Sequence, residues 1–488
     1  MGKLIENVFV TEGVPTDTFI KPPNFNEILV DIRRPGKPVV IEGQSGTGKT
    51  TTVKKIQAAL DDSSLHTYLS ARKPKDVERI SNIAYNGELG SFIIDDFHRL
   101  SSDLKAKLAD IAKIAAEEWD PAQFPKLVII GINDVGSALI QFVPDIAKRV
   151  GVHKISPASK ELTNELVMSG CNALNITFDQ SELVFEESQG DYWLTQQLCQ
   201  TACTVSDVLE ESTETQQVSL DIPRIRKVIV DKLRKAYYPA VKEFCRGRRF
   251  RPSNDPYFKV LKKVSEAGNP VVDLTSLSDN NEDVRGSINN IKDSRLSNLL
   301  ESKELAARHF FYSPETTTFA VEDPAVFYFL RHLDWEALRS DCGFRGRDGN
   351  YEFDIAISFA GENRDLAEYL AERFSALDIQ VFYDANFETN YLGKTWSKEF
   401  RRIFGQASKY VICLLDKHHV EKIWPSFERD VFTPRLVKEE VIPIYLDDTP
   451  IQGIPTDVVG IRFKMDMSDG WQDRAEKEIV FKVIDRLD

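Results

Sequence analysis

The sequence lacks any long apolar stretch. No apolar run approaches the ~18 residues that a membrane-spanning helix requires, and Met1–Val10 has no apolar core of a secretion signal. Glu6 also occupies the position where the myristoylation pattern requires serine or threonine. These absences predict a cytoplasmic protein without a membrane partner.

Cysteine and basic charge are also scarce. The six cysteines include no CxxC pair and no histidine at metal-ligand spacing, which argues against a disulfide scaffold or a cysteine-based zinc site. Lysine and arginine number 62 against 76 acidic residues, and the net charge of −14 argues against a global attraction to nucleic acid. One basic run, Arg246–Arg251, leaves a local contact with nucleic acid or an acidic partner open, although such runs are more often solvated loops or interdomain contacts.

The length indicates several domains. Domains usually have roughly 100–200 residues, so a chain of 488 residues predicts about three domains. Strand-like runs alternate with helical segments at both ends of the chain, which predicts the α/β fold class with parallel sheets.

A phosphate-binding loop follows the first strand-like run. Pro38–Glu42 leads into the sequence GQSGTGKT, and a helical pattern comes next. Strand, glycine-rich loop and helix in this order are typical of the P-loop, whose backbone N–H groups surround the phosphates. Lys49 is predicted to reach the β- and γ-phosphates, and Thr50 to offer a hydroxyl to Mg²⁺. The ATP-binding residues predicted here are Gly43, Gln44, Ser45, Gly46, Thr47, Gly48, Lys49, Thr50 and Thr51.

Another strand-like run ends in two acids. Ser91–Asp96 is apolar up to Asp95 and Asp96, which places both carboxyl groups where parallel strands end. We expect Asp95 to hold Mg²⁺ together with Thr50. Asp96 is expected to orient the attacking water, or alternatively to cap the next helix.

The order of these motifs resembles the AAA+ and STAND branch of P-loop ATPases, in which an extra strand separates the two strands of the phosphate site. The strand-like run Leu65–Leu69 lies between the two motifs, and the later run Leu127–Asp134 contains Asn133 near its end. The resemblance implies that Asn133 senses the γ-phosphate and that Arg149 reaches the nucleotide of a neighbouring subunit, although a solvated surface arginine fits Arg149 equally well. It also implies ATP or ADP and Mg²⁺ as cofactors, and a homo-oligomer on activation.

Residues 158–221 are predicted to form a helical lid, and residues 222–340 a winged-helix domain. Glu187–Cys199 resembles a lid helix of these ATPases without its usual arginine, and Phe310–Val321 resembles the two strands of a wing. Many STAND proteins end this domain with a histidine that holds ADP. Here Glu322 takes its place, and its negative charge is expected to repel a phosphate.

The last part of the chain resembles bacterial TIR domains. After a linker at residues 341–350, Tyr351–Leu370 has the pattern of a buried strand followed by an amphipathic helix, and three further strand-like runs alternate with helical segments. The prediction for residues 351–488 is a flavodoxin-like parallel sheet with helices on both faces. Residues 1–157 form the predicted P-loop ATPase domain at the other end of the chain.

The TIR resemblance implies a site for NAD⁺. In NAD⁺-cleaving TIR domains, one glutamate on the helix after the BB loop stabilises the oxocarbenium-like ribose while the N-glycosidic bond breaks. Glu399 falls one turn into that helix and takes this catalytic position, unless it is a solvated residue of a scaffold TIR domain. His418 and His419 are interpreted as loop residues, and Trp424 as a packing aromatic residue. The residues implied to bind NAD⁺ are Ser358, Phe359, Arg364, Asp384 and Trp396.

Together these parts predict an ATP-binding, oligomerisation-controlled NAD⁺ hydrolase that acts in bacterial antiphage defence by depleting NAD⁺. The sequence has no internal repeat of the kind that sensors use. Either the chain therefore assembles by itself on a ligand, or a separate sensor protein or phage-derived trigger activates it. One alternative is a noncatalytic TIR scaffold on a signalling ATPase, which Glu399 disfavours. The other is an ATP-driven nucleic-acid remodeller, which the acidic total and the TIR resemblance disfavour.

Overall fold

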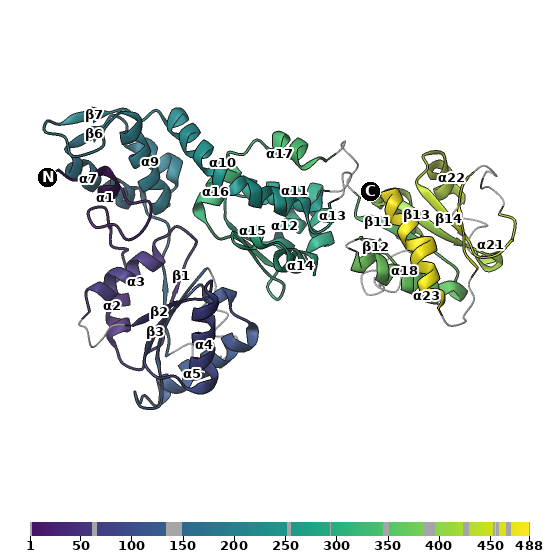
Figure 1. The fold of residues 1–488 in the computed structure, drawn as a ribbon, viewed down its shortest axis with the longest axis horizontal. Coiled ribbons are helices and arrows are strands. Elements are labelled where there is room, and N and C mark those ends of the chain that lie inside the picture. Colours follow the sequence, from purple (N-terminus) through teal and green to yellow (C-terminus); the bar gives the residue numbers. More distant parts are fainter. Residues whose placement is uncertain are drawn as a thin grey trace. The chain divides into compact units, whose positions relative to one another are not determined.

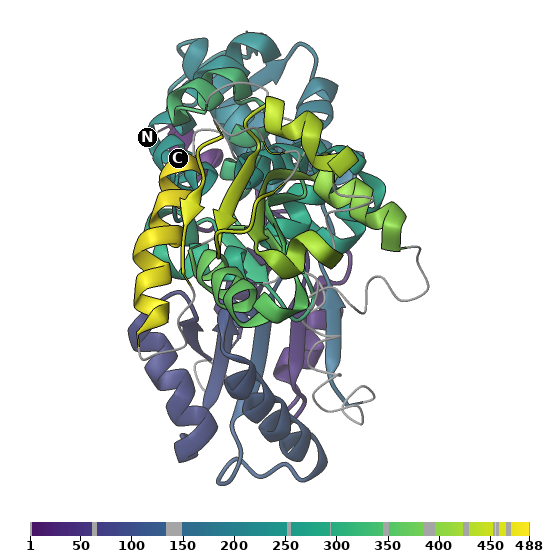
Figure 2. The ribbon, with the colours of Figure 1, turned by 90° about the vertical axis from the view of Figure 1, so that its right-hand side faces the viewer.

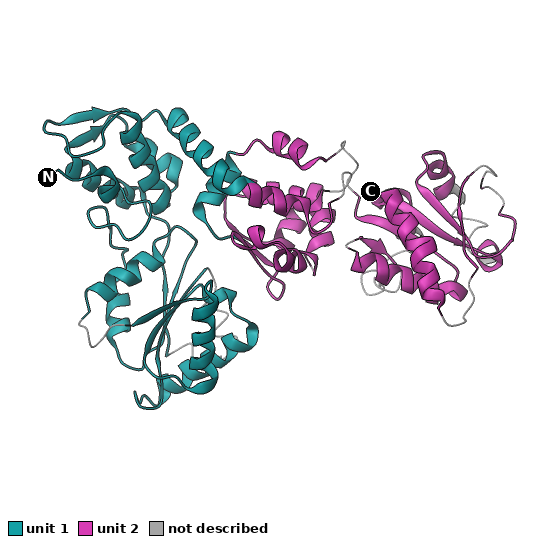
Figure 3. Cartoon of the chain, in the orientation of Figure 1, with its two compact units in different colours: residues 1–238, 321–332 teal, residues 239–320, 333–488 magenta. Residues whose placement is uncertain are grey.

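The computed structural model describes residues 2–487 apart from short internal segments. The segments outside this description are 61–65, 133–148, 251–254, 293, 345–350, 378, 384–395, 423–428, 452–453, 455–457 and 465–469. The chain divides into two compact units, one of residues 1–238 and 321–332 and the other of residues 239–320 and 333–488 (Figure 3). The finer division predicted from the sequence stays a prediction.

The first unit contains a five-stranded parallel sheet (Figure 1). Its strands are β1 (Val39–Glu42), β2 (Thr67–Ser70), β3 (Ser91–Asp95), β4 (Lys126–Gly131) and β5 (Gly151–Lys154). They lie in the order β2-β3-β4-β1-β5, and each neighbouring pair is parallel. The run between the two motifs in the sequence, β2, therefore lies at the edge of the sheet, and it is β4 that separates the strand before the phosphate loop from the strand that ends in Asp95.

Helices cover both faces of this sheet. One face packs against α2 (Phe25–Arg33) and α3 (Lys49–Ala58), and the other against α4 (Pro74–Asn86) and α5 (Ser102–Glu117). Alternate residues of one strand serve opposite faces: Val40 packs with the α4 and α5 cluster, whereas Val39 and Ile41 pack with the α2 and α3 cluster. Burial on both faces explains why these strands are continuous apolar runs in the sequence.

A small helical region follows in the same unit. Its elements are α1 (Ile5–Val8), α7 (Lys160–Leu174), β6 (Ile176–Phe178), α8 (Glu182–Ser188), α9 (Tyr192–Val205) and β7 (Gln216–Val218). The helices agree with the predicted helical content. The parallel pair β6 and β7 was not predicted, because strands of three residues are too short to show an alternating pattern.

Helix α10 (Ile222–Arg246) continues from the first unit into the second. The elements after it are α11 (Pro256–Glu266), β8 (Val271–Asp273), α12 (Leu274–Asn280), α13 (Glu282–Ile291), α14 (Arg295–Ser302), α15 (Glu304–Ala307), β9 (Phe310–Ser313), β10 (Thr318–Val321), α16 (Pro324–Arg331) and α17 (Trp335–Cys342). The three strands form a sheet in the order β8-β10-β9. The ring centroids of Phe310 and Phe319 lie 4.7 and 5.7 Å from that of Phe244, so an aromatic core joins the sheet to α10. Two strands thus lie where the sequence predicts a wing.

The C-terminal part contains a second parallel sheet. Its elements are β11 (Phe353–Ser358), α18 (Arg364–Ala376), β12 (Val381–Phe382), α20 (Trp396–Arg402), the π-helical turn η6 (Ile403–Ala407), β13 (Ser408–Leu415), α21 (Lys417–Lys422), α22 (Arg429–Val437), β14 (Val441–Tyr445), β15 (Ile461–Arg462), α23 (Trp471–Ala475), η8 (Glu476–Val480) and α24 (Phe481–Leu487). The strand order is β12-β11-β13-β14-β15, and neighbouring strands are parallel. The sequence predicted four of these strands; β15 has only two residues and no periodic signal.

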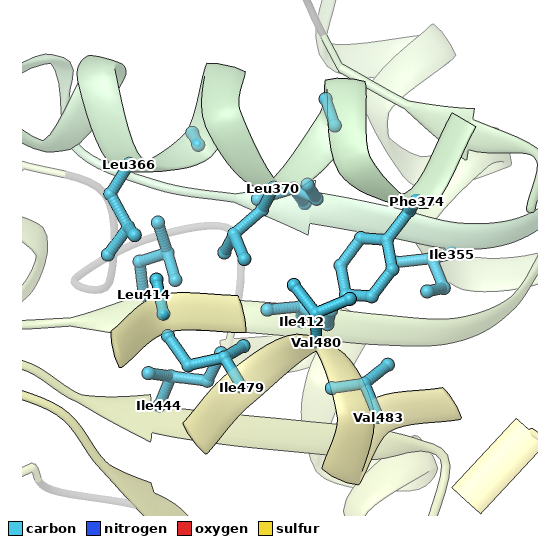
Figure 4. Packing of buried hydrophobic residues seen from close by; sticks show 14 of the residues in the cluster. Ile355, Leu366, Leu370, Phe374, Ile412, Leu414, Ile444, Ile479, Val480 and Val483 are labelled. Carbon is cyan, nitrogen blue, oxygen red and sulfur yellow. The ribbon is translucent and has the colours of Figure 1, made fainter. Parts of the chain in front are cut away.

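Helices also cover both faces of the second sheet. Figure 4 shows α18 facing the strands through Leu366, Leu370 and Phe374, which pack with Ile355 and Ile412. The C-terminal helices, yellow in Figure 2, lie on the same face. Helix α22 and the turn η6 cover the opposite face. The α/β fold class with parallel sheets is therefore confirmed.

Candidate functional site

The loop between β1 and α3 has the geometry of a phosphate cradle. Gly46 and Gly48 both have a φ of 82°, a left-handed backbone conformation that residues other than glycine adopt only with strain. Gly48 directly precedes α3, so the positive end of the helix opens into the loop. The Nζ of Lys49 donates to the carbonyl oxygens of Gly43 at 2.8 Å and Gln44 at 2.6 Å, which holds the ammonium group over the loop.

The surroundings of the Lys49 ammonium group suit the binding of an anion. Burial lowers its pKa from 10.5 to about 8, and the nearby charges of Asp95, Asp96 and Asp191 oppose this shift. An ammonium group that has already lost much of its water gives up little more hydration when a phosphate arrives. The arrangement therefore favours anion binding.

A hydroxyl and a carboxylate meet beside this loop. The Oγ1 of Thr50 donates to Oδ2 of Asp95 at 2.7 Å, and the hydroxyl of Tyr68 donates to the same oxygen at 2.5 Å. Burial and the charge of Asp95 raise the pKa of Tyr68, so it stays a donor. Hydroxyl and carboxylate oxygens are ligands that suit Mg²⁺. The predicted pair Thr50 and Asp95 thus fits such a cation.

Asp96 lies next to this pair in a left-handed conformation, with a φ of 58°. Its carboxylate accepts from the Ser70 hydroxyl at 3.1 Å and pairs with Nε of Arg72 at 3.0 Å. Its side chain makes no cap hydrogen bond to the short helix that follows, which disfavours the capping alternative.

These residues line one cavity of about 360 Å³, a size typical of small-ligand sites. Its walls include most of the predicted loop, both acids, the end of β4 and the N-terminal segment 10–22. The predicted residues that line it are Ser45, Gly46, Thr47, Gly48, Lys49, Thr50, Thr51, Asp95 and Asp96. Gly43 and Gln44 act through the carbonyl groups that bind Lys49.

Two predicted ATP contacts are not placed at this cavity. Asn133 lies outside the described residues, although Gly131 and Ile132 just before it line the cavity. Arg149 is exposed and pairs with Glu117 of α5, and it is not among the described lining residues. Its role toward a neighbouring subunit stays a prediction.

Helix α9, which the sequence predicts as part of a lid, has an acid at its start where the AAA+ resemblance implies an arginine. Asp191 caps α9, and its Oδ1 accepts from the backbone N–H of Leu194 at 2.7 Å. Burial raises the pKa of Asp191 to about 7. A Cβ added at Gly46 would lie only 1.9 Å from Oδ2 of Asp191, so the start of α9 packs directly on the phosphate loop.

Glu322 does not stand as an unpaired charge beside the cavity. Its side chain is 1% exposed, and its carboxylate contacts His98 Nε2 at 2.6 Å, Arg99 Nε at 2.9 Å and Arg72 Nη2 at 3.2 Å. The repulsion expected from the sequence is therefore balanced by neighbouring cations. The backbone oxygen of Glu322 also accepts a hydrogen bond from Ser45 of the phosphate loop.

A second group of predicted residues gathers at the carboxyl end of β11. Ser358 ends this strand, the ring of Phe359 stacks on Tyr383 at 5.5 Å, and Nη1 of Arg364 donates to the Tyr383 hydroxyl at 3.4 Å. The guanidinium of Arg364 also lies 5.6 Å from the centre of the Phe359 ring. Cation, aromatic face and hydroxyl together suit a nucleotide-like ligand.

His419 is not a loop residue, because it lies in α21 and is fully buried. Its Nε2 lies 3.2 Å from the Ser358 hydroxyl, and its backbone N–H donates to Asp416 at 2.8 Å. Asn363 donates to the same carboxylate at 3.0 Å. Burial lowers the pKa of His419 to about 4, so the ring is neutral at pH 7. The sequence interpretation of His419 was wrong; His418 also lies in α21.

Glu399 lies in the first turn of α20 and is only partly exposed. Its Oε2 accepts from Nε of Arg402 at 2.9 Å, and Nη1 of Arg402 also pairs with Glu352 at 2.6 Å. Within the part of the chain that the structure describes, Glu399 makes no polar contact with Ser358 or Arg364. Asp384 and Trp424 lie outside the description, and so does the side chain of Trp396.

A comparison with protein families identifies the C-terminal part. The family model described as "TIR domain" matches residues 355–480. This part of the chain is a TIR domain. Over 111 residues the chain is 32% identical to the 3′ cyclic ADP-D-ribose synthase AaTIR of Aquimarina amphilecti. The match covers 22% of this chain, and the chain spans about a third (34%) of the length of that relative.

Some solved structures are similar to a larger part of the chain. The Aeropyrum pernix ORC1 protein, solved in complex with DNA, has a TM-score of 0.38 and 13% identity, and the match covers 68% of this chain and 97% of that one. Cdc6p from Pyrobaculum aerophilum has a TM-score of 0.34 and 14% identity, with 69% and 98% covered. Both TM-scores are low, so the candidate nucleotide site is inferred from its own geometry and not from these two structures.

One arginine of the basic run Arg246–Arg251 makes contacts within the fold. The guanidinium of Arg246 lies 3.9 Å from the centre of the Phe250 ring, and its Nη1 donates to the carbonyl oxygen of Cys342 at 2.7 Å. Such contacts favour the structural explanation over a nucleic-acid site.

The sequence interpretation missed several residues of both sites. Tyr68 and Arg72 come from β2 and the turn after it, and one signal was available: Ser70 ends β2 in register with Asp95, so both lie at the same sheet edge. In the TIR domain, Tyr383 follows β12 in the same way.

The described residues contain neither a membrane-spanning helix nor a cluster of metal-binding side chains. Among those residues, no helix combines the length and apolar character needed to cross a membrane. In the same ranges, no three histidine, cysteine or acidic side chains are grouped to hold a metal ion.

Proposed function

We propose that the TIR domain cleaves NAD⁺ and that the nucleotide-binding unit controls this activity. The observation that carries the proposal is the TIR match, which includes a relative named for the synthesis of a cyclic ADP-ribose. An ADP-ribosyl group is what remains when NAD⁺ loses nicotinamide. NAD⁺ is therefore the proposed substrate.

Glu399 is the proposed catalytic residue. Cleavage of the bond between ribose C1′ and the nicotinamide nitrogen leaves positive charge on the ribose, which a nearby carboxylate stabilises. Nicotinamide leaves with the bonding electron pair, and water adds to C1′ and releases a proton. The products are nicotinamide, ADP-ribose and H⁺. The ion pair with Arg402 orients the carboxylate on α20.

The proposed NAD⁺ contacts are Ser358, Phe359 and Arg364, together with Asp384 and Trp396. Arg364 offers a cation to the pyrophosphate, and the Phe359 ring offers a face for stacking. The Ser358 hydroxyl is oriented by His419.

A second candidate product follows from the relative. AaTIR is named as a cyclic ADP-ribose synthase. In that reaction a hydroxyl group of the ADP-ribosyl moiety, instead of water, attacks C1′ and loses its proton. Nicotinamide is released in both reactions, so only analysis of the second product separates a hydrolase from a cyclase.

The proposed role of the first unit is to bind ATP or ADP. The loop from Gly43 to Thr51 surrounds the phosphates, Thr50 and Asp95 would hold Mg²⁺, and Asp96 orients water for hydrolysis. When bound, Mg²⁺ would neutralise charge on the phosphate oxygens. Asn133 and Arg149 are the further proposed contacts.

ATP binding is proposed to drive assembly of a homo-oligomer in the cytoplasm. Assembly would raise the effective concentration of TIR domains and switch on NAD⁺ cleavage. Depletion of NAD⁺ would then stop a phage-infected bacterial cell, with a separate sensor protein or a phage component as the trigger.

The proposal is tested with full-length Glu399→Gln. Nicotinamide release from NAD⁺ is measured with and without ATP and Mg²⁺, and the ADP-ribosyl products are separated by chromatography. Loss of a charge that stabilises a transition state is expected to lower the rate by about 10²–10³. Glu372→Gln is the matched control, because Glu372 is an exposed glutamate on α18. This variant is expected to keep the parent rate.

Two outcomes contradict the assignment. Full activity of Glu399→Gln would place the catalytic carboxylate elsewhere. A parent chain that releases no nicotinamide with ATP, at any oligomer size measured in parallel, would instead favour the noncatalytic scaffold.

A further inference from the structure

Five side chains form a charge cluster at one wall of the nucleotide cavity. This Glu322 cluster consists of Arg72, Asp96, His98, Arg99 and Glu322. Glu322 follows β10, whereas the other four lie in or next to the first sheet, so the cluster joins segments more than 200 residues apart in sequence. All five belong to the first compact unit.

The two arginines hold Glu322 in different ways. Arg99 contacts both carboxylate oxygens, is 20% exposed and is absent from the described lining of the cavity. Arg72 contacts one oxygen at 3.2 Å, is 36% exposed and lines the cavity. It also pairs with Asp96. Arg99 is therefore the fixed partner of Glu322, and Arg72 is the partner that a ligand can recruit.

Burial also makes His98 an uncharged partner. Its pKa is lowered to about 3, so at pH 7 the ring donates a hydrogen to Glu322 without adding charge. The charges of Arg72 and Arg99 thus balance those of Asp96 and Glu322. An additional anion in the cavity therefore competes for Arg72 with Glu322 and Asp96, of which only Asp96 is one of the acids at the end of β3.

We propose that Arg72 is a nucleotide-binding residue that exchanges Glu322 for the terminal phosphate of ATP. This inference rests on the proposed binding of ATP and ADP. ATP carries one anionic phosphate more than ADP, and Arg72 lies on the same wall as Asp96, the acid proposed to orient water. Arg72 therefore distinguishes ATP from ADP.

The exchange has a mechanical consequence. Glu322 is linked to the phosphate loop through Ser45 and lies between β10 and α16. With ADP, Arg72 stays on Glu322, and residues 321–332 remain tied to the sheet. With ATP, one of the two arginines leaves, and this segment becomes easier to release.

The test measures equilibrium binding of ADP and of a nonhydrolysable ATP analogue to the full-length chain. Arg72→Gln removes one charge-assisted hydrogen bond to the terminal phosphate, so it should weaken the analogue roughly tenfold and change ADP less than twofold. Glu322→Gln removes the competitor and should strengthen the analogue several-fold relative to ADP. In the double variant the effect of Glu322→Gln on the analogue should disappear, since no Arg72 remains to be released.

Matched controls come from an ion pair away from the cavity. Arg79 Nε lies 2.8 Å from Glu88 Oε1, and neither residue lines the cavity. Arg79→Gln and Glu88→Gln should leave both affinities unchanged. Hydrogen exchange of residues 318–331 adds a readout of release: exchange should be faster with the analogue than with ADP in the parent, and equal in Arg72→Gln.

The outcomes separate the two proposals. If the parent binds ADP and the analogue but Arg72→Gln keeps their affinity ratio, the exchange is wrong and nucleotide binding stands. If the parent binds neither nucleotide, both proposals fail. Arg72 is the more exposed of the two arginines, so Arg72→Gln is expected to fold. This variant therefore tests the exchange even if Glu322→Gln does not fold.

Discussion

Replacing Lys49 by methionine is expected to stabilise the nucleotide-free chain while removing its response to ATP. In the structure the ammonium group is partly buried and binds the carbonyl oxygens of Gly43 and Gln44. Burial lowers its pKa from 10.5 to about 8. Each tenfold loss of proton affinity corresponds to about 1.4 kcal/mol, so the charged form costs at most about 3 kcal/mol.

Loss of the two hydrogen bonds offsets part of this gain, at about 1 kcal/mol each. The net stabilisation of Lys49→Met at pH 7 is therefore about 1 kcal/mol. Between pH 8 and 10.5 the folded parent releases the proton before the unfolded chain does, so the parent becomes more stable as pH rises. The advantage of the variant should accordingly shrink across this window.

Thermal unfolding of the nucleotide-free chain between pH 7 and 10 measures this advantage. Lys107→Met is the control, because Lys107 is exposed on α5. With ATP at 100 times its dissociation constant, the parent and the control should gain about 2.7 kcal/mol and Lys49→Met nothing. A variant that is less stable than the parent at pH 7, or whose advantage is constant with pH, would refute the reasoning about burial.

Two further predictions concern single contacts. Gly46→Ala and Gly48→Ala share the strain of a φ of 82°, but only Gly46→Ala places the new Cβ 1.9 Å from Oδ2 of Asp191. Gly46→Ala should cost about 1 kcal/mol more in thermal unfolding, because Asp191 must leave its helix cap. Equal costs would disprove the close packing of Asp191 on Gly46. His419→Phe should flatten the loss of TIR-domain stability between pH 6.5 and 4 in urea titrations. The parent loses stability there because the unfolded chain binds the proton before the folded histidine, whose pKa is about 4. If His419→Phe loses as much stability as the parent between pH 6.5 and 4, the assignment of a buried neutral ring is wrong.

Local patterns were sufficient to predict the phosphate loop and both parallel sheets. Lys49, Thr50 and Asp95 each lie within a few residues of a strand end, and the rule that parallel strands end at one edge brings them together. The same rule places Ser358 and Arg364 at the edge of the TIR sheet, next to Tyr383. Sequence reasoning succeeds where function depends on short-range order along the chain.

Contacts between distant segments were not predictable in this way. The pairing of Arg72 with Glu322 depends on how the chain returns to the first sheet after residues 73–321. His419 looks like a polar loop residue because its neighbours are charged, and only the packing of α21 against β13 explains its burial. Of the proposed NAD⁺ contacts, Asp384 and the side chain of Trp396 lie outside the described residues, so their positions relative to Glu399 stay predictions.

The first compact unit is not a contiguous length of sequence. Residues 321–332 return to it after an excursion of 82 residues, and α16 brings six buried side chains with it. A gene fusion or truncation with its junction between residues 239 and 332 would strip the first unit of part of its own core. A junction after α17 would leave that core intact. Recombination could therefore exchange the TIR domain at the end of the chain freely, whereas residues 239–320 and the first unit must be inherited together.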